Sequence, residues 1–343
     1  MKRSLFIFLG ILLALTSSAS AECLMTFNTY GPMYASQVAA RSVRIVEDIK
    51  NNHSCELIHF QEAWSENQIG IFLNGLQSRY QIYSPNRQQR IGLMSFSKSA
   101  WASVKTYTYR ANFDGHFLDD VREIVNAKKA FSVVTESLAG AASINTHLHP
   151  TSDQVRILQI LDLLNWRVQN QAQLMIVSGD FNMDPSSLEH FFLRHILNVE
   201  DAMLTTRGQY PSDFCTYCAN NPLGWLSDDH TFDYVFFSRL ASGQKGWVPQ
   251  NVNLVLTGGR NPLSDHYGLK VNFTQGQGSA REIHVEESRK KMLDLFDAVI
   301  LKVLDFPPAR QLNYISLLQR IRSEVQNGQG PYGKYFQNIF QQY

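Results

Sequence analysis

The sequence lacks the features of several specialised classes of protein. It has no low-complexity segment, and 44% of its residues are hydrophobic, which excludes a wholly disordered chain and a fibrous repeat. An excess of one charge is also missing, because 31 Lys and Arg residues offset 30 Asp and Glu residues. Without a run of Lys and Arg, bulk charge does not draw the chain to nucleic acid or to anionic membranes. The 343 residues fit one large domain with an appendage.

Long apolar runs are missing except at the N-terminus. There, two basic residues precede the apolar segment 5–15, which is too short to span a bilayer, and the small-residue sequence 19–21 follows. We therefore expect residues 1–21 to be a signal peptide, cleaved after Ala21, and the mature chain to be secreted or periplasmic. Its loss would leave a slightly negative chain with no membrane-spanning segment.

Cysteine is scarce, and all four cysteines follow the expected cleavage site. An even number in an exported chain favours disulfides. Cys23 and Cys55 each begin an apolar run, so we predict that they bridge the starts of neighbouring strands. Cys215 and Cys218 would close a second, short bridge. A zinc site is the alternative for this pair, but one Cys-x-x-Cys without a second pair is weak evidence for zinc.

Short apolar runs typical of buried strands recur through the first four-fifths of the chain. Helical spacing of apolar residues appears between them, over 38–49 and again from Ser152-Asp153 to Val168. This mixture predicts an α/β (α+β) domain of packed layers over residues 22–274. The expected strands are 23–27, 56–60, 92–96, 131–134, 142–145, 174–177, 233–237 and 269–273.

The pattern of the sequence changes at residues 275–279, a polar, glycine-containing segment that interrupts the strand and helix patterns. Two apolar helical stripes follow, separated by Pro307-Pro308. We expect residues 275–343 to form a C-terminal helical extension, a helix pair that packs on the main domain. The aromatic residues of the tail leave a membrane-surface or partner-binding role as an alternative.

Polar residues capable of chemistry stand at the ends of the expected strands. Side chains in such positions converge at one rim of a sheet. Each motif alone also has a structural explanation, since Gly-Asp-x-Asn is a good turn and Ser-Asp-His suits a surface loop. As an ordered set, their oxygen and amide groups suit Mg²⁺ or Ca²⁺ rather than zinc. The set comprises Asn28, Glu62, His147, Asp180, Asn182, Asp233, Asp265 and His266.

The order of these motifs resembles that of the endonuclease/exonuclease/phosphatase superfamily, whose members hydrolyse phosphodiesters or phosphomonoesters with a divalent metal. The resemblance spans residues 23–273 and rests on Asn, Gln-Glu, Thr-His, Gly-Asp-x-Asn, Asp-Tyr and Ser-Asp-His in sequence. Thr-His-Leu-His (146–149), Gly-Asp-Phe-Asn-Met (179–183) and Lys129-Ala130 are most similar to neutral sphingomyelinases. That subfamily usually has Lys-Gly where this chain has Lys129-Ala130.

The resemblance implies a four-layer sandwich of two facing β-sheets flanked by helices, with the site at one end. It also implies a metal site in which Glu62 is the principal ligand, assisted by Asn28 and Asp265. The expected metal is Mg²⁺, with Mn²⁺ or Ca²⁺ as alternatives.

The same resemblance implies roles for the remaining residues. Asp180 and Asn182 would hold the attacking water and the phosphate. His266 would be the general base, oriented by Asp233. His147 would stabilise the transition state or protonate the leaving group. An imidazole with a carboxylate behind it is chemically suited to removing a proton from water at neutral pH.

Three functions are compatible with the sequence. The first is a secreted, Mg²⁺-dependent, sphingomyelinase-like phosphodiester hydrolase that converts sphingomyelin to ceramide and phosphocholine, with a phospholipid head group at a membrane surface as its partner. The second is an exported, DNase-like endonuclease acting on nucleic acid. The third is a non-catalytic binding module on the same fold, which should have lost ligands that this chain retains.

Overall fold

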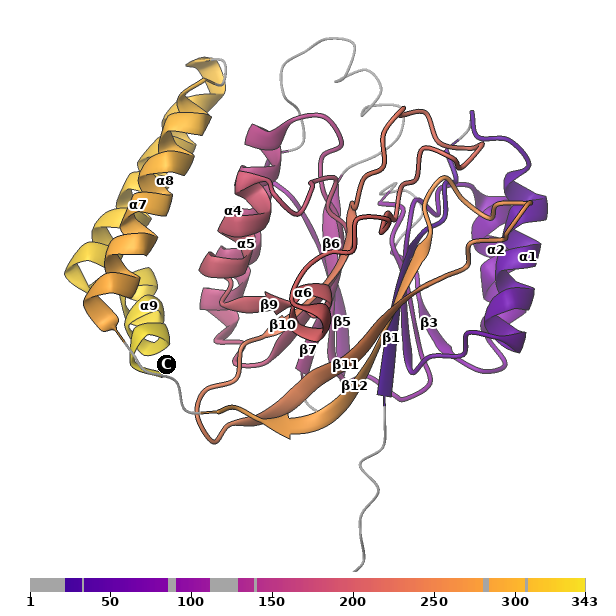
Figure 1. The fold of residues 1–343 in the computed structure, drawn as a ribbon, viewed down its shortest axis with the longest axis horizontal. Coiled ribbons are helices and arrows are strands. Elements are labelled where there is room, and N and C mark those ends of the chain that lie inside the picture. Colours follow the sequence, from indigo (N-terminus) through magenta and orange to yellow (C-terminus); the bar gives the residue numbers. More distant parts are fainter. Residues whose placement is uncertain are drawn as a thin grey trace, which may run out of the picture.

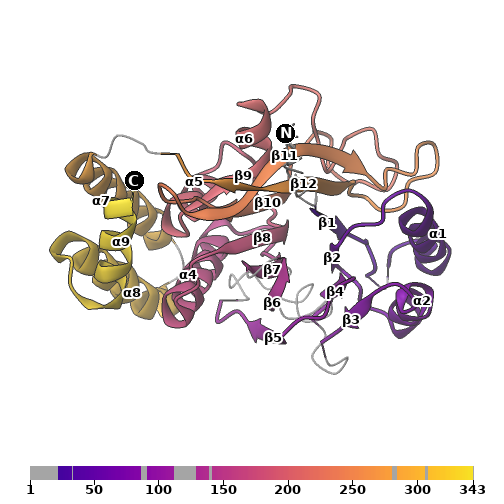
Figure 2. The same ribbon diagram turned by 90° about the horizontal axis from the view of Figure 1, so that it is seen from below.

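Two β-sheets pack face to face between layers of helices (Figures 1 and 2). The computed structural model describes residues 22–32, 34–85, 91–111, 129–138, 141–279, 284–305 and 308–342. The expected four-layer sandwich is therefore confirmed. The expected signal peptide, residues 1–21, lies outside the described residues. None of the described helices combines the length and the hydrophobicity needed to cross a bilayer.

The first sheet is mixed and has the N-terminal strand near its centre. β1 and β2 run parallel because α1 (Val38–Asn51) crosses over between them. α1 and α2 (Glu66–Leu76) cover the outer face of this sheet (Figure 2). Across the sheet, the strands are β11 (Lys245–Val255), β12 (Gly268–Gln277), β1 (Glu22–Asn28), β2 (Leu57–Gln61), β4 (Met94–Ser97) and β3 (Gln81–Tyr83).

The second sheet repeats this arrangement. β7 and β8 run parallel, joined by α4 (Asp153–Asn170), which begins at the N-cap Ser152 as the sequence predicts. α5 (Leu188–Ile196) lies beside α4, and α6 (Ala202–Arg207) follows β9. Across the sheet, the strands are β5 (Ser103–Thr108), β6 (Ala130–Leu138), β7 (Ala141–His147), β8 (Met175–Asp180), β10 (Asp233–Ser238) and β9 (Val199–Asp201).

Buried polar contacts join the two sheets at their parallel strand pairs. His59 Nδ1 on β2 lies 2.7 Å from Ser178 Oγ on β8, and Gln61 Nε2 donates to Asn145 Oδ1 on β7 at 2.7 Å. Buried polar groups without partners are destabilising, so these pairs fix how the sheets face one another. The carboxyl ends of β1, β2, β7 and β8 consequently lie at the same end of the sandwich, the upper end in Figure 1.

The C-terminal part forms α7 (Val285–Leu304), α8 (Pro308–Asn327) and α9 (Gly330–Gln342). These helices lie on the outer side of α4 and α5 (Figure 1) and share an apolar cluster with them. Tyr332, Phe336 and Phe340 of the tail are buried in that cluster. Three helices therefore stand where the sequence predicts a pair. The domain boundary at residue 274 stays a prediction, and β12 continues to Gln277.

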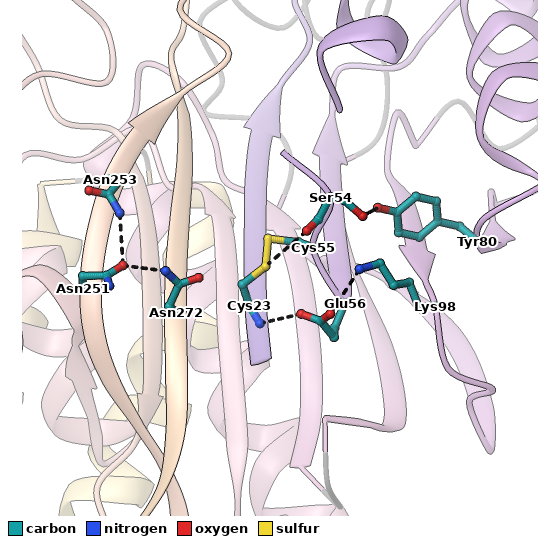
Figure 3. Close-up of a disulfide and its surroundings, with 9 residues drawn as sticks. All are labelled: Cys23, Ser54, Cys55, Glu56, Tyr80, Lys98, Asn251, Asn253 and Asn272. Carbon is teal, nitrogen blue, oxygen red and sulfur yellow. Dashed lines mark hydrogen bonds and ion pairs between the residues drawn. A yellow bond between two sulfur atoms is a disulfide. The ribbon is translucent and has the colours of Figure 1, made fainter. Parts of the chain in front are cut away.

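Both expected disulfides are present. Cys23 at the start of β1 is bonded to Cys55, which lies two residues before β2, with 5.1 Å between their Cα atoms (Figure 3). Beside this bridge, the Glu56 carboxylate accepts a hydrogen bond from Cys23 N at 2.8 Å and another from Lys98 Nζ at 3.1 Å. Cys215 is bonded to Cys218, so neither sulfur is available as a thiolate ligand for zinc.

Candidate active site

The structure brings all of the predicted site residues to one end of the sandwich. Asn28, His147 and Asp180 are the last residues of β1, β7 and β8. Glu62 directly follows β2, and Asn182 lies two residues beyond β8. On the antiparallel neighbours the order is reversed, since Asp233 is the first residue of β10 and pairs with Asp180. Asp265 and His266 lie three and two residues before the start of β12.

Asp233 and His266 form a buried pair. His266 Nδ1 lies 2.7 Å from Asp233 Oδ2, and because a carboxylate only accepts, Nδ1 carries the proton of this hydrogen bond. The other ring nitrogen, Nε2, faces Asp180 Oδ2 at 3.7 Å. Asp233 Oδ1 is buried without a hydrogen-bond partner among the described residues. This geometry fixes the imidazole in one orientation, with Nε2 turned towards Asp180.

Asp180 is held from both sides. Asn28 Nδ2 donates to its Oδ2 at 2.8 Å, and the backbone N–H of Asn182 donates to its Oδ1 at 2.9 Å. The sharp turn that places Asn182 requires a φ of 51°, which asparagine tolerates better than most residues. At Gly179, a Cβ would lie 1.9 Å from the Thr146 carbonyl oxygen, so only glycine allows β7 and β8 to approach this closely.

Lys129 and His147 form a second pair in the site. Lys129 Nζ lies 3.0 Å from His147 Nε2, and an ammonium can only donate, so this ring nitrogen is the acceptor. Burial, together with the charge of Lys129, lowers the pKa of His147 well below its usual value. His147 also lies 3.5 Å from Asp180 Oδ2 and 3.9 Å from Glu62 Oε1. The sequence signal for Lys129 is its place directly before a buried strand.

The acidic side chains of the site are buried, which makes their charged forms unfavourable. Burial raises the pKa of Asp180 to about 6 and that of Asp265 to about 7. Burial likewise raises the pKa of Glu62, and Asp180 adds to the rise. Burial alone would lower the pKa of His266, but Asp233, Asp180 and Asp265 outweigh it and hold the pKa well above its usual value. The site as it stands therefore favours extra positive charge.

A hard divalent cation fits this set of donors. Ligand atoms of Asp180, Asp233 and His266 all lie within 4.8 Å of one another, and Glu62 and Asp265 line the same cavity. Carboxylate and carboxamide oxygens are the ligands that Mg²⁺ and Ca²⁺ prefer. A cation beside these groups would also offset the negative charge of the carboxylates, and so lower the pKa of His266.

The site opens into a cavity of about 440 Å³. Among its described lining residues, Lys129 is the only Lys or Arg, whereas Glu62, Asp180 and Asp265 are acidic. Aromatic rings form much of the remaining wall, a feature that the sequence does not single out. These rings belong to Tyr30, Tyr34, Trp64, Tyr217, Trp225 and Phe232.

Arg41 holds the mouth of the site together, and its role is not evident from the sequence. This α1 residue is almost fully buried, and its guanidinium donates to the carbonyl oxygens of Thr29, Tyr30 and Leu263 at 3.1, 2.6 and 2.8 Å. It thereby joins the segment after β1 to the one that carries Asp265. Five fixed donors suit such a cluster of carbonyl groups.

Comparison with known proteins places the chain in a family. Residues 25–266 match the Endonuclease/Exonuclease/phosphatase family, and the chain belongs to it, as the order of its motifs indicates. Members of this family are hydrolases that act on phosphodiester bonds. Human sphingomyelin phosphodiesterase 2 is 25% identical over 197 residues, which cover 54% of this chain and 46% of that protein. The chain thus matches about half the length of this curated relative.

Solved structures show the same fold. An endonuclease/exonuclease/phosphatase from Bacteroides vulgatus has a TM-score of 0.58 at 16% identity, covering 75% of this chain and 100% of that one. D. rerio TDP2, complexed with a single-strand DNA product, has a TM-score of 0.56 at 14% identity, covering 74% and 99%. The human Nocturnin catalytic domain, with bound sulfate, has a TM-score of 0.54 at 21% identity, covering 75% and 95%.

Proposed function

We propose that this protein is an exported, divalent-metal-dependent phosphodiester hydrolase that cleaves sphingomyelin to ceramide and phosphocholine. The observation that carries the proposal is the Asp233–His266 pair, 2.7 Å apart, whose free Nε2 faces Asp180 within a cavity rich in carboxylates. An oriented imidazole beside acidic ligands is what hydrolysis of a phosphodiester by water requires.

His266 acts as the general base. Its Nδ1–H donates to Asp233, which leaves the Nε2 lone pair directed at a water held by Asp180. As the water oxygen attacks phosphorus, its proton passes to Nε2. Asp233 stabilises the imidazolium that forms and keeps the ring in place. Asn182, which is anchored by its side-chain bond to the Leu148 carbonyl at 3.0 Å, helps to position the phosphate.

Lys129 and His147 stabilise the phosphoryl group. The attacked phosphorus gains negative charge on its oxygens, and Lys129 supplies a buried positive charge next to it. His147, neutral beside this lysine, offers a hydrogen bond to the phosphoryl or leaving-group oxygen. The bond between phosphorus and the ceramide oxygen breaks, this oxygen takes a proton from the His147 ring N–H, which solvent replaces, and the phosphate stays with choline.

The metal would be held by Glu62, Asn28 and Asp265. We propose Mg²⁺ as the ion, with Mn²⁺ and Ca²⁺, which also bind oxygen ligands, as alternatives. A cation held there would supply the positive charge that phosphodiester hydrolysis needs at the phosphoryl and leaving oxygens. Asn28 links the two parts of the site, because its amide nitrogen bonds Asp180 while its oxygen accepts from Tyr30 N at 3.0 Å.

Two observations favour a lipid head group over nucleic acid. The curated relative is a sphingomyelin phosphodiesterase, although the match covers less than half of it. The described cavity wall also has three acidic residues and one lysine, a poor surface for the repeated phosphates of DNA. Export after removal of residues 1–21, to the exterior or a periplasm, is supported by the two disulfides, which persist in oxidising compartments.

The test is a parallel assay of the mature protein on sphingomyelin vesicles and plasmid DNA. Each is incubated with Mg²⁺ or with a chelator, and His266→Ala is the control for contaminating activity. We expect phosphocholine release that requires both Mg²⁺ and His266, with the plasmid intact. Plasmid nicking with the same requirements would replace the lipid function with the endonuclease. Hydrolysis of neither substrate would favour a non-catalytic binding module.

A further inference from the structure

Three aromatic side chains form a group at the outer part of the active-site cavity. Tyr30, Tyr34 and Trp225 line this cavity, and all three also line an adjoining hollow of about 380 Å³. Trp225 Nε1 donates to Tyr30 Oη at 2.9 Å, and the Tyr34 ring lies 6.0 Å from the Trp225 ring at 76°. The three rings therefore stand between the two hollows as a connected wall.

The wall is exposed yet held in position. Trp225 is 66% exposed and Tyr34 is 56% exposed, whereas Tyr30 is only 7% exposed. The backbone N–H of Trp225 bonds the buried Tyr217 hydroxyl, and the carbonyl of Tyr30 accepts from Arg41. Neighbouring exposed aromatic rings at a cavity mouth are unusual, because covering them would remove apolar surface from water. A ligand in the cavity would cover them.

Charge distinguishes the two ends of this cavity. Lys129 lies beside His147, and it is the only Lys or Arg among the described residues that line either hollow. Arg41 lines neither hollow, although its guanidinium contacts the Tyr30 ring, so the exposed Tyr34 and Trp225 rings are the ones that the cation of a ligand can meet. Aromatic ring faces attract cations, and the 5.2 Å separation of the Arg41 guanidinium from the Tyr30 ring centroid is one such contact within the protein.

We propose that Tyr30, Tyr34 and Trp225 form a subsite for a quaternary ammonium group. The inference rests on the proposed function for the phosphate end, where Lys129 and His147 lie, and it assigns the other end of the head group. A trimethylammonium group has no N–H donor to satisfy, and it presents methyl groups that pack on ring faces while its charge is attracted by them. The wall selects choline esters over uncharged alcohols of the same shape.

The test uses two soluble ligands of the same shape, so that docking to a membrane plays no part. Phosphocholine and its neutral-tail isostere 3,3-dimethylbutyl phosphate are titrated calorimetrically into the full mature protein with Mg²⁺. We expect the wild type to prefer phosphocholine about tenfold, and Trp225→Ala to reduce the preference to about twofold. Trp225→Phe keeps a ring face and should retain most of the preference. Phe191→Ala removes an aromatic side chain that is 47% exposed on α5 and does not line the cavity, and it should change nothing.

Three results would overturn the subsite. Equal affinity of the wild type for both ligands would show that charge is not recognised. An equal loss of affinity for both ligands in Trp225→Ala would show that Trp225 makes only an apolar contact. Tighter binding of deoxyadenosine monophosphate than of phosphocholine, lost in Trp225→Ala, would show that the wall stacks on bases.

The parallel assay on vesicles and plasmid separates this inference from the function it rests on. A Trp225-dependent preference for phosphocholine without vesicle hydrolysis would keep the subsite and reject the hydrolase. Vesicle hydrolysis without that preference would keep the hydrolase and reject the subsite. Melting temperatures of the Trp225 variants identify any general loss of folding.

Discussion

The Asn28 amide at the end of β1 donates a 2.8 Å hydrogen bond to Asp180 at the end of β8. These residues are 152 positions apart and belong to different sheets. The bond therefore joins the two halves of the sandwich at the point where the site lies. Both side chains are buried, so their mutual geometry is fixed by packing before any ligand binds.

Replacing Glu62 with Gln tests the metal site. The amide has nearly the same shape but no charge, and a neutral amide binds Mg²⁺ poorly. We expect activity to fall by several orders of magnitude while the fold stays that of the wild type. Adding Mg²⁺ should no longer raise the melting temperature. Calorimetric titration of Mg²⁺ together with steady-state kinetics measures both. Near wild-type activity would show that Glu62 is not a ligand.

The two histidines of Thr-His-Leu-His should differ in the property that they support. His147 lies beside Lys129 and Asp180, so His147→Ala should lower kcat about a hundredfold. His149 is fully buried, and its Nδ1 accepts from Ser152 N at 3.0 Å at the start of α4. His149→Ala should instead lower the melting temperature and leave kcat within about threefold. The reverse assignment of activity and stability would exchange their roles.

Stability of the metal-free protein should depend on pH in a defined direction. The folded-state pKa values of Asp180 and Asp265, about 6 and about 7, exceed their usual value of 3.8. Their contribution is therefore most favourable when both are protonated, and it is lost as pH rises from about 4 to about 7. Mg²⁺ bound at the proposed site would favour the ionised carboxylates and offset the cost of burying their charge. We expect a larger rise in melting temperature on adding Mg²⁺ at about pH 8 than at about pH 5. An equal rise at both pH values would contradict this prediction.

Loss of the Cys23–Cys55 disulfide should destabilise the first sheet. The bridge closes a loop of 32 residues that contains α1, and its removal should cost about 3 kcal/mol of unfolding free energy. Denaturant unfolding of the Cys23→Ser/Cys55→Ser protein gives the value. Peptide mapping under non-reducing conditions supplies the independent check, since free Cys23 and Cys55 thiols would exclude the bridge.

Much of the site could be predicted because strand ends are readable from sequence. A buried apolar run followed by a polar residue located Asn28, Glu62, His147 and Asp180, and parallel strands bring such ends together. The disulfide between Cys23 and Cys55 followed from the same reasoning, because the two cysteines lie at the starts of strands that are parallel neighbours.

Helices and strands that contain residues unfavourable to them could not be predicted from the sequence. β11 contains Pro249, which breaks a strand pattern, but β11 lies at the edge of its sheet and the register shifts at this residue. α2 contains Gly70 and Gly75, poor helix formers, yet a Cβ at Gly75 would lie 2.5 Å from a Val46 side-chain atom. Close packing of α1 on α2 therefore explains one of these glycines, and this contact exists only in the folded chain.

The residues at the candidate site that the sequence did not reveal also depend on long-range contacts. In the sequence, Arg41 looks like an ordinary charged residue of a helix. Its contact with the Leu263 carbonyl exists only in the folded chain. Trp225 lies in an irregular segment with no periodic pattern, and its place at the cavity follows from contacts of the folded chain such as its hydrogen bond to Tyr30.

The most direct test of the proposed hydrolase is a double-mutant cycle on Asp233 and His266, with sphingomyelin hydrolysis and melting temperature measured for each protein. Asp233→Asn should lower kcat about a hundredfold or more with little change in KM, because an unanchored imidazole takes the wrong tautomer. Since the two residues act as one unit, Asp233→Asn/His266→Ala should be no slower than His266→Ala alone, within about twofold. Fully additive losses, or a lowered melting temperature with kcat intact in Asp233→Asn, would contradict the account.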